Sequence, residues 1–289
     1  MMVLSIQSQV VFGCAGNSAA VPVLQARGHE VLAVPTALLS NTPYYPRSEG
    51  GSLPADLVRR LLEGALERIP HGGVAAVITG WMGSAETVEA VADLLAQFRR
   101  AHPGALYLCD PVMGDTDFGF YAEPATARAI AERLVPCADI LTPNVFEQTY
   151  LAQQGVRPRA GCLRATTGVE TSPGRIGVSL ACDGRTWTTD TPRLANNATG
   201  TGDVFSAVFL AERLAGHDAA SSLEVAVSTV HLLVDDANRR GLRELPIADH
   251  LAAIAARPRA STAASQSGET EGSRRRRALQ GRVEPSPVS

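Results

Sequence analysis

The stretch NATGTGDVF (residues 197–205) is a glycine-punctuated turn that ends in a carboxylate and runs directly into an apolar helical pattern. Gly200 and Gly202 allow successive backbone N–H groups to point into one concavity, and the following helix adds the positive end of its dipole. Asp203 then lies where it can accept a proton from a substrate hydroxyl group. The stretch predicts the anion-binding turn and base of a kinase; an ordinary strand-to-helix turn is the alternative.

Short apolar runs alternate with helical patterns on both sides of this turn. Strands are expected at residues 3–6, 31–34, 74–79, 106–109 and 140–141, and helices at 17–28, 55–68, 84–100, 125–135, 204–214 and 219–240. Strands that alternate with helices predict an α/β fold with a mainly parallel, doubly wound sheet. Ligands bind such sheets beyond the carboxyl ends of the strands, and the polar motifs of this chain follow those ends.

The rest of the chain divides into one domain and a tail. Residues 1–256 are expected to form the domain, with a hairpin of residues 176–182 and 186–189 around Asp183-Gly184. Within it, residues 155–175 sustain no apolar period, so we expect an irregular and shortened segment there. Residues 257–289 contain almost no large apolar side chain and predict a disordered tail; its arginine run at 274–277 is assigned no function.

The basic residues exclude two classes of enzyme. The 289-residue chain contains no lysine, so all 26 residues of the Lys and Arg total are arginines. A P-loop NTPase needs a lysine on the phosphates, and a pyridoxal-phosphate enzyme needs one for its Schiff base. A net charge of -3 also argues against a nucleic-acid partner and favours a small-molecule substrate.

Cysteine usage and hydropathy predict a cytoplasmic protein. The five cysteines are scattered, with no CxxC pair and no neighbouring histidine cluster, which is typical of reduced thiols. The start of the chain lacks the basic region of a signal peptide, and no apolar run approaches the roughly 18 residues of a membrane span. We therefore expect no membrane partner.

Two acidic motifs follow predicted strands. CDPVMGD (residues 109–115) places Asp110 and Asp115 where the phosphates of a nucleotide, or a Mg²⁺ bound to them, would lie. A β-turn held by Asp110 and Pro111 is the structural alternative. TPNVFE (residues 142–147) supplies a hydroxyl, an amide and a carboxylate, and it also reads as a capping box in which Asn144 and Glu147 begin a helix. These two roles are compatible.

The first strand ends in small and polar residues within IQSQVVFGCAGNSAA (residues 6–20). Ser8 could donate a hydrogen bond to a ligand, and the glycines permit close approach. A purely structural strand-to-helix loop explains the same residues equally well.

Taken in order, the motifs resemble the pyridoxal kinase family of the ribokinase superfamily. The matching segments are IQSQVVFGCAGNSAA (6–20), SNTPYY (40–45), GWMGSAE (80–86), CDPVMGD (109–115), TPNVFE (142–147) and GTGDVF (200–205). The resemblance implies a single three-layer α/β/α ribokinase-like domain and a homodimer. It also implies ATP-dependent phosphorylation of the 5′-hydroxymethyl group of pyridoxal, pyridoxine or pyridoxamine.

The same resemblance implies a role for each matching residue. Asp203 would be the catalytic base, and Gly200, Thr201 and Gly202 the anion hole. The nucleotide would be bound by Asp110, Thr142, Asn144, Glu147 and Thr199, with Asp110 and Glu147 holding Mg²⁺ partly through water. The vitamin would be bound by Ser8, Thr42, Trp81, Asp115 and Tyr121. A monovalent cation is left open.

The chain departs from the family pattern in three places. Thr42 and Pro43 stand where the family has histidine and threonine, and Trp81 stands where tyrosine is common, so the substrate preference is open. The interval between Asn144 and Gly200 is too short for the family's additional helix and core strand. Either residues 162–167 form a degenerate strand reached by a loop, or the sheet has a gap that weakens ATP binding.

These departures keep two other functions open. A hydroxymethylpyrimidine kinase acts on a hydroxymethyl group of a similar nitrogen heterocycle. A non-catalytic vitamin-binding protein descended from a kinase would explain the shortened interval.

Overall fold

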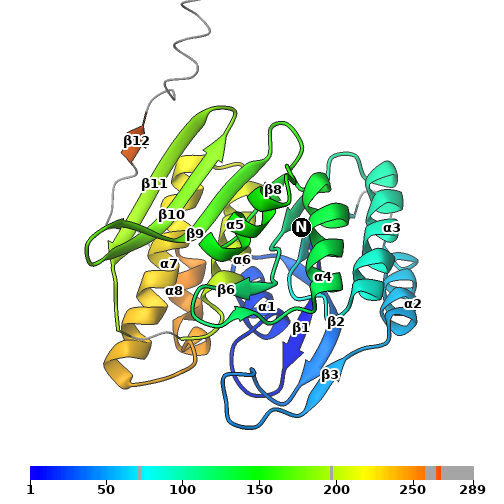
Figure 1. Cartoon of the computed structure of the whole chain (residues 1–289), viewed down its shortest axis with the longest axis horizontal. Helices are drawn as coiled ribbons and strands as arrows, with labels where there is room; N and C mark the ends of the chain where they lie inside the picture. The colour runs from blue at the N-terminus through cyan, green and yellow to red at the C-terminus, as the bar shows by residue number, and fades with distance from the viewer. Residues whose placement is uncertain (70–72, 196–197, 258–264, 268–289) are drawn as a thin grey trace, which may run out of the picture.

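The computed structural model describes residues 1–69, 73–195, 198–257 and 265–267. Ten strands of this described part form one sheet in the order β12-β11-β10-β9-β8-β5-β4-β1-β2-β3 (Figure 1). A separate small hairpin joins β6 (Gly114–Asp115) to β7 (Gly119–Phe120).

The centre of the sheet is parallel, as the alternating pattern predicts. Its strands are β2 (Glu30–Leu39), β1 (Met2–Val10), β4 (Val74–Thr79), β5 (Leu106–Cys109), β8 (Ile140–Leu141) and β9 (Leu163–Ser172). Antiparallel strands extend both edges: β3 (Gly50–Ser52) pairs with β2, and β10 (Arg175–Cys182), β11 (Arg185–Pro192) and β12 (Ser265–Ser267) continue from β9. The α/β prediction is therefore confirmed.

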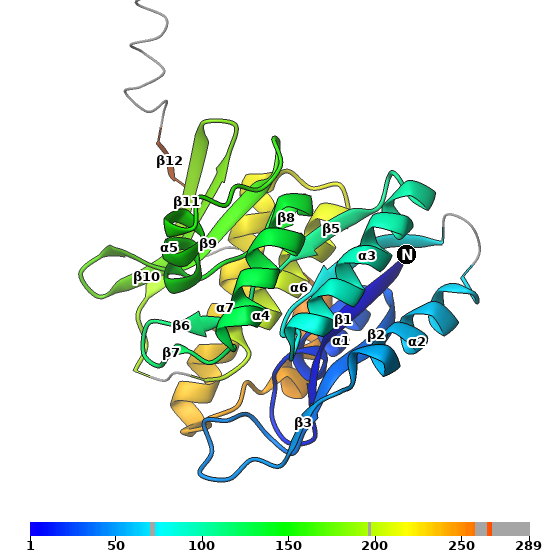
Figure 2. The same ribbon diagram turned by 45° about the vertical axis from the view of Figure 1, so that its right-hand side comes forward.

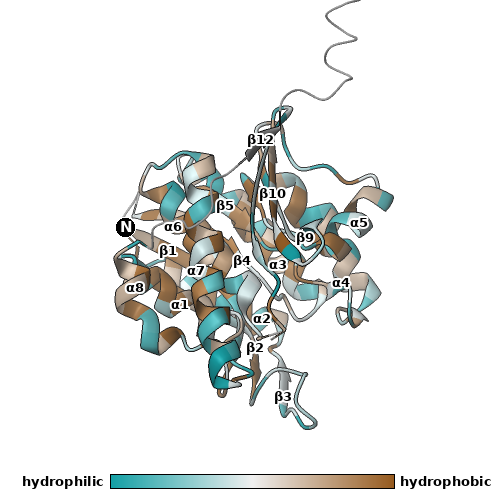
Figure 3. Ribbon diagram, turned by 90° about the vertical axis from the view of Figure 1, so that its left-hand side faces the viewer, coloured by the Kyte–Doolittle hydropathy of each residue, from teal (hydrophilic) through white to brown (hydrophobic). Residues whose placement is uncertain are grey.

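Helices cover both faces of the sheet and complete the three layers (Figures 2 and 3). One face carries α1 (Asn17–Ala26), α6 (Thr201–Leu214), α7 (Ala219–Arg240), the 3-10 turn η3 (Ile247–His250) and α8 (Leu251–Ala255). The other carries α2 (Ala55–Leu66), α3 (Ala85–Ala101), α4 (Pro124–Ala129), its continuation through Ile130–Leu134 and Val135–Cys137, and α5 (Val145–Gln153).

Local signals at several element ends are confirmed. Ser84 caps α3, because its hydroxyl accepts a hydrogen bond from the N–H of Thr87 at 3.2 Å. The hairpin between β10 and β11 turns at Asp183 (φ 45°) and Gly184 (φ 79°), the left-handed pair that a tight hairpin requires.

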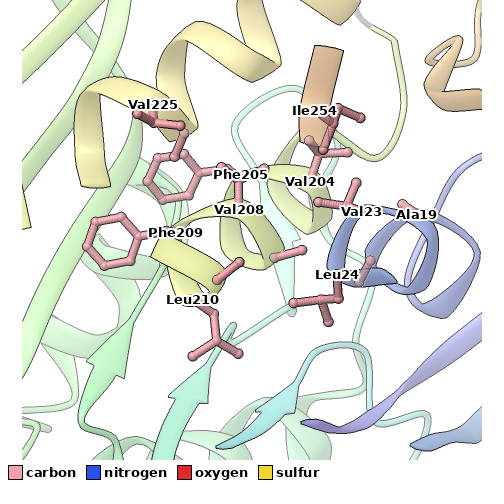
Figure 4. Close-up of a cluster of buried hydrophobic side chains, with 14 of the residues drawn as sticks. Ala19, Val23, Leu24, Val204, Phe205, Val208, Phe209, Leu210, Val225 and Ile254 are labelled. Carbon is pink, nitrogen blue, oxygen red and sulfur yellow. The ribbon is translucent and has the colours of Figure 1, made fainter. Parts of the chain in front are cut away.

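Helix α6 is enclosed by its neighbours. Figure 4 shows its side chains between α1, α7 and α8, including Val204, Phe205, Val208, Phe209 and Leu210, all of them buried. A helix that is apolar on nearly every side is a buried core helix. Asp203 thus lies on the first turn of a helix that is packed against neighbours on nearly every side.

A buried carboxylate ties the far end of α6 to two other segments. Glu212 is 2 % exposed and accepts hydrogen bonds from Arg27, just after α1, at 2.5 Å and from Arg257, after α8, at 2.8 Å. Removing one partner of a buried pair leaves the other desolvated and uncompensated.

Glu212→Gln is therefore expected to lower the free energy of unfolding by about 1–3 kcal/mol. Urea unfolding followed by circular dichroism measures this change. Asp56→Asn is the matched control, since Asp56 makes an exposed pair with Arg60 on α2 and should change stability little. Equal midpoints for the two variants would contradict the prediction.

The expected loop at residues 155–175 is wrong for its second half. Residues 163–172 form β9, which pairs in parallel with β8 and antiparallel with β10, so the sheet has no gap at this position. Ala165 is fully buried opposite Leu180, whereas Arg164 and Thr166 lie on the other face of the strand. The first of the two alternatives, a strand reached by a loop, is the one the structure contains.

The tail prediction is tested only in part. Residues 265–267 form β12 against β11, so these three residues are not disordered. The rest of the predicted tail from residue 258 on, including the arginine run at 274–277, lies outside the described residues, as does Asn197. Among the described residues, no helix has both the length and the apolar content of a bilayer span. The domain limit at residue 256 stays a prediction.

Candidate active site

The site is built on the first turn of α6. Gly200 precedes the helix with φ 88°, a left-handed conformation that favours glycine, and as the N-cap residue it supplies no side-chain hydrogen bond to the first turn. The unpaired N–H groups and the helix dipole together attract an anion. Gly200, Thr201 and Gly202 therefore have the geometry predicted for an anion hole.

Asp203 lies on this turn and is half-buried. Its side chain keeps some solvent access, but desolvation raises the pKa of the carboxyl group to about 6. The backbone N–H of Gly16, just before α1, lowers the pKa of the carboxyl group and opposes part of that rise. A base with a pKa near 6 is deprotonated at neutral pH and is still basic enough to take a proton.

A chain of hydrogen bonds joins α6 to the ends of two strands. Ser206, one turn after Asp203, donates to Oδ2 of Asp110 at 3.1 Å, and its hydroxyl also lies 2.9 Å from that of Thr142. Asp110 follows β5 and Thr142 follows β8, and all three side chains are buried. The sheet edge and the helix start therefore meet as the strand-end argument predicts.

Ser206 escaped the sequence analysis because it stands inside an apolar helix without a motif of its own. Its position three residues after Asp203 was the available signal, since such residues share a helix face. We expect Ser206→Ala to lower kcat/KM about tenfold, because a hydrogen bond to a charged group contributes about 1.5–3 kcal/mol. Ser228→Ala, which removes a buried hydroxyl without a partner in the described residues, is the control. Equal losses in steady-state kinetics would contradict a specific role for Ser206.

Glu147 braces the loop that carries Asp110. Asn144 and Glu147 form the predicted capping box of α5, with Oδ1 of Asn144 accepting from the N–H of Glu147 and Oε2 of Glu147 accepting from the N–H of Asn144. The other Glu147 oxygen accepts from the N–H of Met113 at 3.0 Å, and Nδ2 of Asn144 donates to the carbonyl of Gly114 at 2.7 Å. The capping-box interpretation of this motif is thus confirmed, and its part in binding a nucleotide or metal stays a prediction.

The carboxylates of the site are not neutralised by a basic side chain. Desolvation, then the charges of Glu147 and Asp203, raise the pKa of Asp110 well above its usual range. Desolvation likewise raises the pKa of Glu147 to about 8, against three backbone N–H donors. No cationic group of the described residues is among the causes for Asp110 or Glu147. Such a cluster suits a cation.

The donor set fits Mg²⁺ bound together with phosphates. No group of three or more Asp, Glu, His or Cys side chains in the described residues could hold a metal ion by itself. Mg²⁺ characteristically takes only one or two protein carboxylates plus substrate phosphates and water. Asp110 is the more available ligand, because both Glu147 oxygens already accept backbone N–H groups.

Two of the residues expected to contact the vitamin carry buried hydroxyl groups. Ser8 is buried at the end of β1, and its Oγ lies only 2.6 Å from where a side-chain carbon on Gly16 would be, so Ser8 adjoins the donor to Asp203. Thr42 is also buried, and its hydroxyl has no partner in the described residues. A buried unpartnered hydroxyl is expected to bond to a ligand or water.

The segment of residues 114–121 contacts Tyr44 and Trp81. Tyr44 donates to Asp115 at 2.9 Å and packs against Phe118, with 4.8 Å between ring centroids, so two loops are joined. Trp81 and Tyr121 lie in contact, 5.9 Å between centroids. Tyr121 is 42 % exposed, yet desolvation and then the charge of Glu147 raise the pKa of its hydroxyl, which therefore faces the acidic residues.

Thr199 was expected to contact the nucleotide, and that contact stays a prediction. Its hydroxyl donates to Glu244 at 2.7 Å, and its N–H donates to the carbonyl of Arg243 at 3.2 Å. Glu244 was missed by the sequence analysis because no motif surrounds it. The middle of β9 also lies beside the Asn144 motif, because the N–H of Thr167 donates to the carbonyl of Pro143.

The chain is similar to known kinases both in sequence and in structure. A family model described as phosphomethylpyrimidine kinase matches residues 11–248. The chain is 38 % identical over 262 residues to a pyridoxal kinase of Rubrobacter xylanophilus, covering 85 % of this chain and 90 % of that one. It is 35 % identical to a pyridoxal kinase of Leifsonia xyli over 265 residues, 86 % and 94 % of the two chains.

Solved structures of pyridoxal kinases have the same fold as this chain. The pyridoxal kinase of Leishmania donovani in complex with ADP and pyridoxamine superposes with a TM-score of 0.82 at 26 % identity, over 92 % of this chain and 99 % of that one. The same enzyme with ADP and pyridoxine gives a TM-score of 0.81 at 27 % identity, over 92 % and 98 %.

Proposed function

We propose that this protein is a vitamin B6 kinase. The premise is its family: the chain belongs to the phosphomethylpyrimidine kinase family, and within it to the pyridoxal kinases. The chain phosphorylates the 5′-hydroxymethyl group of pyridoxal with ATP and yields pyridoxal 5′-phosphate. Pyridoxine and pyridoxamine are substrates of the same reaction, which serves vitamin salvage.

One observation carries this function. Asp203 combines a pKa of about 6 with a position on the uncapped first turn of α6, beside the acidic group of Asp110 and Glu147. A base, an anion-binding turn and a site for a cation are therefore next to one another. Phosphoryl transfer needs this combination, because positioning and charge neutralisation account for most of its catalysis.

Each part of the site has a step to perform. Asp203 accepts the hydroxyl proton as the substrate oxygen bonds to the γ-phosphorus, and the bond to the ADP oxygen breaks. The N–H groups of residues 200–202 stabilise the charge on the transferred phosphoryl group. Ser206 holds Asp110 and Thr142 in a fixed relation to that turn.

ATP is the phosphoryl donor. We propose that its phosphates lie along Asp110, Thr142 and Asn144, with Thr199 and Glu147 holding the adjoining backbone in place. Mg²⁺, held by Asp110 and through water by Glu147, would neutralise phosphate charge when bound. Chelation with EDTA should abolish activity, and added Mg²⁺ should restore it.

On the vitamin side, we propose Ser8 and Thr42 as hydrogen-bonding groups and Trp81 as a stacking surface. Asp115 and Tyr121 cover the site. The unpartnered hydroxyl of Thr42 supports its assignment.

The direct test follows pyridoxal 5′-phosphate formation by absorbance in a mixture of the protein, Mg²⁺, ATP and pyridoxal. We expect turnover that depends on both substrates and on Asp203. No product above that of the Asp203→Asn variant would overturn the proposal.

A hydroxymethylpyrimidine kinase is the second candidate, and the description of the matching family model favours it. Values of kcat/KM on pyridoxal and on hydroxymethylpyrimidine, measured side by side, separate the two activities. The non-catalytic binder depended on a gap in the sheet, and β9 occupies that position. Calorimetry with ATP tests that alternative, because a binder of this kind would take pyridoxal alone.

We further propose a homodimer. Val11 and Phe12, which follow β1, are 91 % and 60 % exposed, and neighbouring exposed apolar side chains support a contact with a second copy. Light scattering after gel filtration should give twice the 30.4 kDa chain mass, and Val11→Asp should weaken the dimer. A monomer at micromolar concentration would contradict this assembly.

We also propose a cytoplasmic location. The five cysteines are free thiols, as is usual in a reducing compartment. Fractionation of the native host with an antibody to the chain tests the location.

A further inference from the structure

Glu244 lies between α7 and η3, outside every motif of the sequence, and its carboxylate joins three loops. Oε2 accepts from the N–H of Cys14 at 2.7 Å and from the hydroxyl of Thr199 at 2.7 Å. Oε1 accepts from the hydroxyl of Tyr45 at 2.8 Å. The donors come from the loop after β1, the turn before α6 and the loop between β2 and β3.

The loop after β1 and the turn before α6 meet in backbone contact around this carboxylate. A side-chain carbon on Gly13 would lie 2.6 Å from Cδ of Glu244, and one on Gly200 would lie 2.0 Å from the carbonyl oxygen of Cys14. The Cys14 thiol also donates to the carbonyl of Leu245 at 3.2 Å. At Gly13 and Gly200 these segments therefore pack too closely to accept a larger side chain.

This contact reaches the catalytic base. Gly16 stands two residues after Cys14, and its backbone N–H acts on the Asp203 carboxyl group and lowers its pKa. The position of Cys14 therefore determines where that donor lies, and the position of Thr199 determines where the turn of residues 200–202 begins.

The third hydrogen bond, from Tyr45 to Glu244, holds the loop between β2 and β3. Tyr45 packs edge-on against Phe12, with 5.8 Å between ring centroids, and its hydroxyl reaches Glu244. The same loop contains Thr42, and through Tyr44 it is also bonded to Asp115. Glu244 and Asp115 thus each accept a side-chain hydrogen bond from this loop.

We propose that Glu244 is a positioning residue for the phosphoryl transfer inferred above: its carboxylate holds the Gly16 donor, the anion-binding turn and the substrate loop in one register. Glutamine is nearly the same shape but offers a single acceptor oxygen to three donors. Misplacement of catalytic groups by about 1 Å can cost about 100-fold in rate.

The test compares Glu244→Gln with Asp249→Asn, a control in the same segment whose carboxylate pairs with Arg240. We expect Glu244→Gln to lower kcat about 10- to 100-fold and to raise KM for pyridoxal, while Asp249→Asn resembles the wild type. Tyr45→Phe removes one donor and should mainly raise KM for pyridoxal. In the Glu244→Gln background it should add little, because the two substitutions break the same contact.

The pH profile separates positioning from simple charge. The charge of Asp203 acts on Asp110 and on Cys14, the backbone N–H of Gly16 acts on Asp203, and the charge of Glu244 acts on Cys14. Loss of the Gly16 donor would move the acidic limb of kcat/KM to higher pH, whereas removal of a negative charge alone would move it to lower pH. A shift to higher pH supports the proposal, and a shift to lower pH overturns it.

This inference depends on the kinase function, and the two can fail separately. A wild-type protein without turnover would refute the function itself. An active wild type with unchanged kcat, KM and pH profile in Glu244→Gln would refute only the role of Glu244. If Glu244→Gln does not fold, Thr199→Val and Tyr45→Phe replace it, and wild-type kinetics in both would overturn the proposal.

Discussion

Replacing Asp203 with asparagine is expected to lower kcat by about 10²- to 10⁴-fold, the usual contribution of a general base. Asparagine has nearly the same shape and can still accept the hydrogen bond from Gly16, so the turn should keep its structure. It cannot take the hydroxyl proton. KM for ATP should change little, because the N–H groups that face the phosphates belong to the backbone.

Steady-state kinetics with pyridoxal and Mg-ATP measure this loss. Asp235→Asn, which changes an exposed carboxylate on α7, is the matched control and should be fully active. An Asp203→Asn variant with more than about a tenth of the wild-type kcat would show that another group, or water, takes the proton.

The pH dependence of the wild type follows from the same residue. The pKa of Asp203 is raised to about 6, so the base becomes protonated as the pH falls through that value. The logarithm of kcat/KM should therefore decline with a slope near one below pH about 6. This limb should be absent from the residual activity of Asp203→Asn.

Stability should change in the opposite direction. A carboxyl group whose folded pKa is raised favours the native state at low pH, and this stability is lost as the pH rises through the folded value. At pH 7 to 8 the ionised Asp203 is therefore destabilising, and Asp203→Asn should gain about 1 kcal/mol or somewhat more. A more stable but inactive variant would be hard to explain by misfolding.

Prediction from sequence succeeded where the signal is local. The capping box of Asn144 and Glu147 depends on a spacing of three residues, and the hairpin at Asp183-Gly184 on two adjacent residues, so both could be found without the fold. The order of strands and helices likewise placed Asp110 and Thr142 at strand ends.

Strand β9 was only one of two alternatives in the sequence analysis, because its apolar pattern is weak. Only Leu163 and Ala165 carry the apolar face near its start, while Arg164 and Thr166 face the other side and Gly168 interrupts the run. Pairing with β8 and β10 supplies the missing stability, and that pairing is a property of the sheet.

Glu244 could not have been found from spacing. Its partners Cys14, Tyr45 and Thr199 lie 230, 199 and 45 residues away in the chain. A carboxylate whose partners are all distant has no local signature, so its role depends entirely on the tertiary fold. Ser206 is intermediate, since it shares a helix face with Asp203 but bonds to Asp110, which is 96 residues away.

Gly200→Ala is expected to show the other large loss, because two separate requirements meet at this position. The backbone has φ 88°, and an added Cβ would lie 2.0 Å from the carbonyl oxygen of Cys14 and 3.0 Å from its carbonyl carbon. Neither atom belongs to a flexible side chain. The turn or the loop after β1 must move, and the N–H groups of the anion hole move with it.

Gly216→Ala is a control that separates the two requirements. Gly216 has nearly the same backbone conformation, φ 83°, but a side-chain carbon added there would have no described neighbour within 4 Å. It should cost about 1–2 kcal/mol of stability from the left-handed conformation and leave kcat unchanged. Gly200→Ala should cost more stability than this and should also lower kcat by about 100-fold, since anion-hole donors act only when correctly placed. Gly202→Ala, whose nearest neighbour is the Asp110 carboxylate at 3.9 Å, should be milder. If Gly200→Ala and Gly216→Ala instead lost equal stability and kept full kcat, the close contact with Cys14 would have no part in catalysis, and the backbone of this turn would not be the anion hole.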